Sequence, residues 1–254
     1  MNTITEKFEI NSVPLYDVKR NNLTYLIDSL IKLNLPQQLI TINLDFIRIS
    51  SQNMEFLNLC KNSSINFIDG VPVGWLIKLI YKKNCEIVTG HLLFEACLEY
   101  CQANRLKIAL VGSTENILSK VREKISNNYP LVEVFSIAPS PLFELNDKEN
   151  KEVINQLNIF SPSFTFVALG CPRQEFWINN YKSIIGNGIF AGIGSVFTVF
   201  SGEAKKAPQF LSSVGMEWFW RFLHEPKRLF KRYFIQDIPF FILLLLKILT
   251  KRFI

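Results

Sequence analysis

Short apolar stretches alternate with longer amphipathic stretches along the first four-fifths of the chain. The short stretches have the length of β-strands and are rich in Val, Ile and Phe: residues 38–44, 65–68, 85–89, 107–112, 132–137, 164–170 and 188–194. The longer stretches place apolar residues at helical spacing: residues 22–33, 75–83, 92–103, 117–127, 146–160 and 174–184. Strands that alternate with helices predict an α/β, Rossmann-like fold with a mostly parallel sheet flanked by helices.

The last fifth of the chain departs from this pattern in charge and in hydrophobicity. Residues 205–254 contain 10 basic and 3 acidic residues, whereas residues 1–204 contain 18 basic and 19 acidic ones. Aromatic residues are interleaved with these cations, and residues 238–246 form an apolar stretch about half as long as the roughly 20 residues of a membrane-spanning helix. The sequence therefore predicts an α/β core over 1–204 and a basic, aromatic, helical appendage over 205–254.

Three interpretations of this appendage are open. Its apolar stretch can lie in the interface of an anionic membrane, with its lysines reaching the headgroups. It can instead pack into the core or into an oligomer. Basic residues among aromatic ones also suit nucleic acid, but the four consecutive leucines at 243–246 argue against a nucleic-acid groove. We expect membrane association and no nucleic-acid partner.

Composition and cysteine usage limit the class of protein further. A chain of 254 residues that is 48% hydrophobic can bury a core and is neither disordered nor of low complexity. Its five cysteines contain no C-x-x-C pair, which fits free thiols in a reducing compartment. The first residues lack the apolar stretch of a signal peptide. We expect a cytoplasmic protein that is peripheral on the inner face of the plasma membrane.

Small residues follow several of the predicted strands. Gly170 ends one strand, and Gly192, Gly194 and Ser195 end or follow the last one. The carboxyl ends of the strands hold ligands in open α/β sheets, and glycine lets a phosphate or ribose approach the backbone. These four residues are candidates for nucleotide binding, although each glycine can equally be an ordinary tight turn. The chain has no G-x-G-x-x-G sequence and no P-loop, so the two best-marked nucleotide motifs are excluded.

Polar side chains also mark two earlier strands. Asp69 directly follows the apolar stretch 65–68, where a carboxylate could act as a general base at the edge of the sheet. Asp69-Gly70 before Pro72 is equally a favoured turn. Thr41 and Asn43 alternate with apolar residues and share one strand face. They need polar partners, which neighbouring backbone or the hydroxyls of a substrate could supply.

The stretch G-C-P-R-Q-E-F-W at 170–177 concentrates polar residues where a strand meets a helix, although Pro172 followed by Glu175 is also good helix-opening chemistry. Together with I-T-I-N at 40–43, F-I-D-G-V-P-V at 67–73 and the E-W-x-x-R-x-x-x-E-P-x-R pattern at 217–228, in this order, it resembles the WecG/TagA/CpsF family, glycosyltransferase family 26. The likeness extends from about residue 40 to about residue 233, most of the chain.

This resemblance implies an activity. Members of the family transfer a sugar from a UDP-sugar to an undecaprenyl-diphosphate-linked saccharide in bacterial surface polysaccharide synthesis, with inversion and without a metal or other cofactor. The resemblance implies these roles: Asp69 as the base, Thr41, Asn43 and Gln174 as substrate-binding residues, and Arg221 and Arg228 as the basic positions of the appendage.

The residues themselves agree with this chemistry. An inverting transfer needs one base for the acceptor hydroxyl and positive charge for the departing diphosphate. The chain has no D-x-D and only two histidines, so arginines that fork onto phosphate oxygens are the expected substitute for a metal. For Arg228 and Arg232, binding of phospholipid headgroups is the other open interpretation. Whether the chain forms a homo-oligomer is open as well.

Two departures from the family pattern keep a second function class open. Leu92 stands where an aspartate of a G-x-D-L element is expected, and Thr198 stands where the family often has aspartate. These differences fit a different donor sugar, a weakened enzyme, or a nonenzymatic membrane-bound protein that binds a nucleotide sugar or a lipid carrier. Retention of Asp69 together with Gln174 favours the enzyme.

Overall fold

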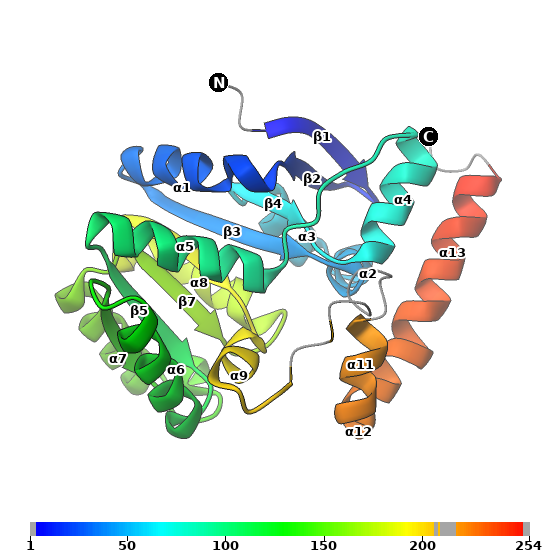
Figure 1. Ribbon diagram of the computed structural model, residues 1–254. Helices are drawn as coiled ribbons and strands as arrows, with labels where there is room; N and C mark the ends of the chain where they lie inside the picture. The colour runs from blue at the N-terminus through cyan, green and yellow to red at the C-terminus, as the bar shows by residue number, and fades with distance from the viewer. Residues whose placement is uncertain (1–3, 206–207, 209–216, 251–254) are drawn as a thin grey trace.

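One eight-stranded sheet forms the centre of the computed structural model, which describes residues 4–205, 208 and 217–250 (Figure 1). In chain order the strands are β1 (Ile4–Ile10), β2 (Val13–Val18), β3 (Pro36–Ile42), β4 (Ile65–Ile68), β5 (Lys107–Gly112), β6 (Glu133–Ile137), β7 (Phe164–Ala168) and β8 (Gly188–Gly192). Their spatial order is β1-β2-β4-β3-β8-β7-β5-β6. Every neighbouring pair is parallel except β1 and β2, which form an antiparallel hairpin at one edge. The predicted α/β fold with a mostly parallel sheet is confirmed.

Helices cover both faces of the sheet because alternate strand residues are apolar on both sides. In β5, Ile108 and Leu110 pack toward one face, whereas Ala109 and Val111 pack toward the other. The first face is covered by α1 (Leu23–Lys32), α5 (Gly90–Asn104), α6 (Glu115–Asn128) and α9 (Val196–Ser201). The second is covered by α2 (Leu44–Gln52), α3 (Met54–Asn62), α4 (Val71–Tyr81), α7 (Asp147–Phe160) and α8 (Arg173–Ile185).

The predicted strand at 85–89 is wrong. Residues 83–89 form an irregular connection between α4 and α5, held to the sheet where Val88 N donates to Ile68 O at 2.9 Å. The position beside β4 that a further strand would need is occupied on one side by β2 and on the other by β3. The hairpin β1–β2, which the pattern did not predict, therefore takes the place of that strand.

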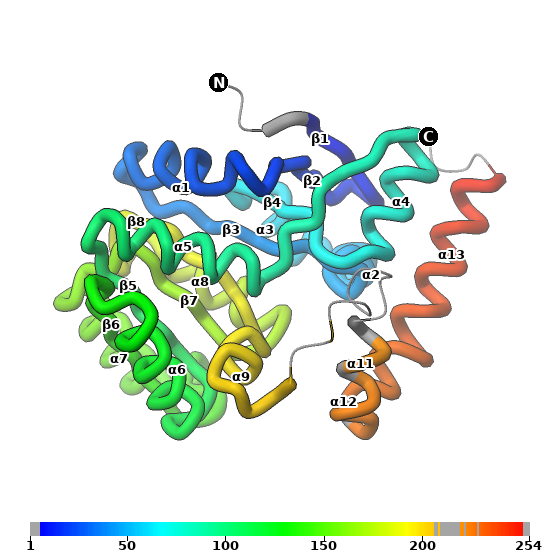
Figure 2. The backbone as a smooth tube through the Cα atoms, in the orientation of Figure 1, coloured from blue at the N-terminus to red at the C-terminus, as the bar shows by residue number. Residues whose placement is uncertain are grey.

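The C-terminal residues form a helical layer at one side of the molecule, beside α2 (Figure 2). It contains α11 (Glu217–His224), α12 (Pro226–Phe230), the π-helix η3 (Lys231–Asp237) and α13 (Ile238–Leu249). Leu244 of α13 is fully buried in the apolar cluster formed by β3, α2, α3 and α4. Among the described residues, no helix combines the length and the hydropathy needed to cross a bilayer. The boundary between an α/β core over 1–204 and an appendage over 205–254 stays a prediction.

Candidate active site

The polar candidates of the first half of the chain meet at the carboxyl edge of the sheet. β3 and β4 are neighbours, with Thr41 paired to Phe67 and Ile42 to Ile68. Asp69 N continues this ladder and donates to Ile42 O at 2.9 Å. Asp69 therefore follows β4 directly beside the end of β3, where Thr41 and Asn43 lie. The chain then turns at Gly70, whose φ of +84° favours glycine, and enters α4 with Pro72 in its first turn.

The side chain of Asn43 is hydrogen-bonded to the first turn of the helix that follows it. Its Oδ1 accepts hydrogen bonds from Asp45 N at 3.0 Å and Phe46 N at 3.4 Å, which makes it the N-cap of α2. Thr41 is buried and faces the start of α5, because its Oγ1 lies 3.7 Å from the point where a Cβ on Gly90 would stand. Neighbouring backbone thus partners the side-chain oxygen of Asn43, one of the two interpretations open from sequence.

Gln174 and Glu175 fill the space between the ends of β7 and β8. Gln174 Oε1 accepts from Gly170 N at 3.2 Å, and its Nε2 donates to Glu175 Oε1 at 2.7 Å. Both side chains are buried. A Cβ on Gly192 would lie 2.6 Å from both Gln174 Nε2 and Glu175 Oε1, so any larger residue there would displace these side chains. The structure thus gives Gly192 a packing reason that is separate from any contact with a nucleotide.

Burial also changes the chemistry of Glu175. The carboxyl is 1% exposed, and this desolvation raises its pKa to about 7, against the opposing effect of the Gln174 amide. Sequence reasoning did not single out Glu175 as a titrating group. The sequence does contain a signal that Glu175 is buried. Gln174, Trp177 and Ile178 form the buried face of α8, and Glu175 lies beside them on the same helix.

The remaining nucleotide candidates lie beside the same edge. Gly170 and Gly194 adopt positive φ values of +82° and +47°. Ser195 precedes α9, and Val196 of this short helix lies 3.3 Å from the Cβ position of Gly90. The turn after β8 therefore contacts the first turn of α5, close to Thr41. The ends of β7 and β8 are surrounded by Gly170, Gly192, Gly194 and Ser195. Nucleotide binding by these residues stays a prediction.

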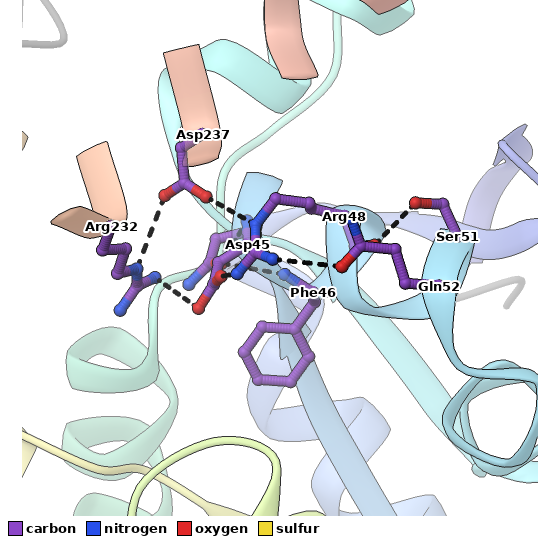
Figure 3. A network of polar contacts seen from close by, with 8 residues as sticks. Asp45, Phe46, Arg48, Ser51, Gln52, Arg232 and Asp237 are labelled. Carbon is purple, nitrogen blue, oxygen red and sulfur yellow. Dashed lines mark hydrogen bonds and ion pairs between the residues drawn. The ribbon is translucent and has the colours of Figure 1, made fainter. Parts of the chain in front are cut away.

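Four charged side chains form a closed ring between α2 and η3 (Figure 3). Asp45 Oδ1 pairs with Arg48 and its Oδ2 with Arg232 Nη2 at 3.1 Å. Asp237 Oδ1 pairs with Arg48 Nε at 3.2 Å and its Oδ2 with Arg232 Nε at 3.4 Å. Each carboxylate thus contacts both arginines through different oxygens. We call these four residues the ion ring.

Sequence reasoning did not find this ring. From sequence alone, Asp45 is an ordinary acidic residue in the first turn of a helix. Its partner Arg232 lies far away in the sequence. Binding of phospholipid headgroups was one interpretation of Arg232 from the sequence. In the structure, its guanidinium forms ion pairs with two carboxylates of its own chain. Burial works against this cation, but Asp45 and Asp237 outweigh it and raise the pKa of Arg232. Burial and the nearby Asp45 raise the pKa of Asp237.

The basic candidates of the appendage are only partly located. Arg221 belongs to α11 and Arg228 to α12, but their side chains lie outside the described residues. α11 packs on α12, α12 packs on η3, and η3 packs on α2. Trp220 Nε1 also donates to Lys205 O at 3.1 Å, which ties α11 to the segment after α9.

Two surface hollows lie away from Asp69. One lies between α7 and α8 and includes Asn150, Lys151 and Tyr181 in its lining. The other lies between α2 and the appendage and includes Arg48, Ile235 and Phe240. Within 4–205 and 217–250, no three His, Cys, Asp or Glu side chains are grouped to hold a metal ion.

The whole of this arrangement falls within one family match. A model of the Glycosyl transferase WecG/TagA/CpsF family matches residues 8–253. The chain belongs to this family. The resemblance predicted from the motifs is therefore confirmed, and the match runs from within β1 through the sheet edge and into the appendage.

Three similar proteins share the name N-acetylglucosaminyldiphosphoundecaprenol N-acetyl-beta-D-mannosaminyltransferase. The protein of Bacillus subtilis (strain 168) is 27% identical over 94% of this chain and 90% of its own length. That of Bacillus spizizenii is 30% identical over 65% of this chain and 63% of its own length, so the chain spans under two thirds of that relative. That of Staphylococcus aureus (strain MW2) is 25% identical over 80% and 77%. The chain is similar to these transferases.

Proposed function

We propose that this glycosyltransferase is an inverting enzyme that moves a sugar from a UDP-sugar to an undecaprenyl-diphosphate-linked saccharide at a membrane surface. The observation that carries the proposal is the position of Asp69. In a chain of this family, a carboxylate stands directly after β4, hydrogen-bonded through its backbone to the end of β3. Strand ends of this kind are where open α/β sheets hold their ligands.

The proposed reaction is a direct displacement. Asp69 takes the proton of the acceptor hydroxyl as its oxygen forms a bond to the anomeric carbon of the donor. The bond from that carbon to the diphosphate oxygen breaks on the opposite face, which inverts the configuration, and UDP leaves with the electron pair. Arg221 and Arg228, carried on α11 and α12, supply positive charge to the leaving diphosphate. In this role they replace a metal ion.

The other candidates hold the substrates in this proposal. Gly170, Gly192, Gly194 and Ser195 let the nucleotide approach the backbone at the ends of β7 and β8. Thr41, Asn43 and Gln174 contact sugar hydroxyls or orient the groups that do. Asn43 Oδ1 and Gln174 Oε1 accept from backbone N–H groups, and Gln174 Nε2 gives one of its hydrogens to Glu175. The amide hydrogens of Asn43 and the second one of Gln174 are therefore the groups offered to a substrate.

The appendage supplies the proposed membrane contact. α13 buries Leu244 against the core and exposes Ile242, Leu243, Leu246 and Leu249, with Lys247 among them. An exposed apolar face bordered by lysine is suited to the interface of an anionic bilayer. A lipid-linked acceptor would be presented at that surface. We therefore place the protein as peripheral on the membrane face that carries its acceptor.

The names of the relatives suggest the first substrates to test. N-acetylglucosaminyl-diphospho-undecaprenol is the first acceptor, and UDP-N-acetylmannosamine is the first donor. The donor panel also includes the UDP derivatives of N-acetylmannosaminuronic acid, glucose, galactose and glucuronic acid, because epimers are distinguished by few hydrogen bonds. Release of UDP and the mass of the lipid product are measured for each donor, with and without the acceptor.

One donor is expected to give acceptor-dependent UDP release and a product larger by one sugar. Addition of EDTA should leave this rate unchanged. Activity that is lost in EDTA and restored by Mg²⁺ or Mn²⁺ would overturn the role given to the arginines. Binding of UDP and acceptor with no release of UDP from any donor would favour the nonenzymatic carrier that the Leu92 and Thr198 departures leave open.

A further inference from the structure

The ion ring is the part of the contact between the appendage and the core that requires one specific orientation. The apolar contact of Leu244 favours burial but does not by itself fix an orientation. The ring does, because each guanidinium presents a planar fork and each carboxylate offers two oxygens at fixed angles. Asp45 and Asp237 are 6% and 7% exposed, so water competes little for these contacts.

On the core side, the ring is attached to the edge that carries the candidate site. Asp45 lies in the first turn of α2, and its backbone N–H donates to Asn43 Oδ1 at 3.0 Å. Arg48 follows one turn later on the same helix and is also bonded to Gln52 Oε1 at 3.4 Å. The carboxylate that receives Arg232 is therefore two residues from Asn43 and follows the strand that contains Thr41.

On the appendage side, the unusual winding of η3 brings both ring residues to one face. Arg232 and Asp237 are five residues apart, which is the hydrogen-bonding interval of a π-helix. In an α-helix the same two side chains would diverge. Pro239, two residues after Asp237, has no N–H to donate to the carbonyl four residues before it, which fits a departure from α-helical bonding here.

Aromatic contacts connect η3 to the two helices that carry the basic candidates. The ring of Phe234 lies 5.1 Å from that of Phe222 in α11 and 5.3 Å from that of Phe230 in α12. Leu229 of α12 is buried as well. The positions of α11 and α12 relative to the sheet edge thus depend on where η3 sits on α2.

We propose that Asp45, Arg48, Arg232 and Asp237 are positioning residues that set α11 and α12 over the carboxyl edge of the sheet. This inference rests on the proposed function in one respect, since it takes Arg221 and Arg228 to act on the substrates. The ring itself touches no reacting atom. It orients the appendage, and through it the cations that the transfer needs.

The test compares three variants of the full chain. Arg232→Gln leaves two buried carboxylates facing one arginine, and Asp237→Asn leaves two arginines facing one carboxylate. The double variant removes one charge of each sign and leaves Asp45 and Arg48 as a matched pair. Lys148→Gln, which removes one exposed cation from α7, is the control for lost charge. Hydrogen exchange of residues 217–237 and kcat/KM for acceptor are measured for each, beside the melting temperature.

Each single variant should exchange its 217–237 amides roughly 10- to 100-fold faster than wild type, while exchange in β5 and β7 stays unchanged. The kcat/KM for acceptor should fall by roughly 10- to 100-fold, as expected for misplaced cations. The double variant should lie closer to wild type than the product of the two single effects, because no buried charge is left unmatched. If the ring served only global stability, exchange in the variants would be faster throughout the protein, in β5 and β7 as well as in 217–237.

Single variants with wild-type exchange in 217–237 would overturn the proposal, as would faster exchange there with unchanged kcat/KM. A double variant as impaired as the combined singles would also contradict it. A wild-type protein that transfers no sugar to any acceptor would refute the proposed function and the positioning role together. Faster exchange in the single variants of such a protein would then show that the ring holds the appendage without serving a transfer.

Discussion

At the carboxyl edge of the sheet, the candidate residues are placed by contacts within and between neighbouring strands. Asp69 is held by the backbone of β3, and the side chain of Gln174 is hydrogen-bonded to Gly170 and Glu175. In the appendage, placement depends on side chains from distant parts of the chain, above all Arg232 on Asp45 and Leu244 in the core cluster. We therefore expect the edge to be as rigid as the sheet, and the appendage to shift without any strand having to separate.

This difference divides the proposed chemistry into two parts. The base belongs to the rigid edge, and the cations that stabilise the leaving group belong to the appendage. Substitutions at the edge should change turnover and leave appendage docking intact. Substitutions in the appendage should change docking and leave the sheet intact.

The largest effect is expected for Asp69→Asn. Asparagine keeps the size and the turn propensity of aspartate but cannot accept the proton, so turnover should fall by roughly 10²- to 10⁴-fold. UDP binding and the melting temperature should stay near those of wild type. Because an Asn-Gly sequence can deamidate to aspartate, Asp69→Ala is measured beside it. Asp147→Asn, at the exposed start of α7, is the matched control. Turnover within a few-fold of wild type would mean that Asp69 serves only the turn.

The next largest effect separates the appendage from the core. Leu244 is fully buried, so Leu244→Ala should weaken docking of α13 by about 2–5 kcal/mol. Exchange of residues 217–250 should accelerate, while β5 and β7 stay protected. Leu243→Ala, at the adjacent half-exposed position, should change little. Equal acceleration in the sheet and the appendage would show that the two regions unfold as one unit, contrary to the comparison.

A smaller effect is expected on the outer face of the same helix. Leu243 and Leu246 are about half exposed, and replacing both with serine should weaken binding to anionic vesicles by roughly tenfold. The melting temperature should not change, because neither side chain is in the core. Serine at the exposed Leu131 and Leu145, far from the appendage, provides the control pair. Unchanged cosedimentation of the Leu243/Leu246 variant with vesicles would count against the membrane interface.

The sequence predicts the fold where hydrophobic periodicity decides the structure. β5 and β7 are apolar on both faces and lie where expected, because only a strand covered on both sides by helices suits such residues. The stretch 85–89 also contains consecutive β-branched residues, but it finds no free position beside β4, since β2 of the hairpin and β3 occupy both sides. Competition between segments for one place in a sheet is a tertiary property that local pattern does not contain.

The same limit applies to the candidate site. Asp69 is predictable as an edge residue, because the carboxyl end of a parallel strand has a fixed place in such a fold. Asp45 is not, because its role depends on Arg232 and Asp237, which approach it only after the appendage folds back onto α2. Asn43 lies between these cases. An asparagine directly before a helix predicts an N-cap, but one sequence does not indicate whether a substrate also contacts it.

The smallest expected effect concerns Glu175, which lies where the two regions meet. Burial raises the pKa of its carboxyl to about 7, and the nearby Asp45 of the ion ring also raises it. Between the unfolded pKa near 4.5 and the folded pKa, the folded protein holds a proton that the unfolded chain has lost. The stability supplied by this group is therefore complete below about pH 4.5 and decreases as the pH rises toward 7. Glu175→Gln keeps an acceptor for Gln174 but does not titrate, so the decrease in melting temperature between pH 5 and pH 8 should become shallower. Glu152→Gln, on the exposed face of α7, should keep the wild-type slope. An unchanged slope in Glu175→Gln would mean that this carboxyl is already ionised in the folded protein and that the edge tolerates a buried charge beside the ion ring.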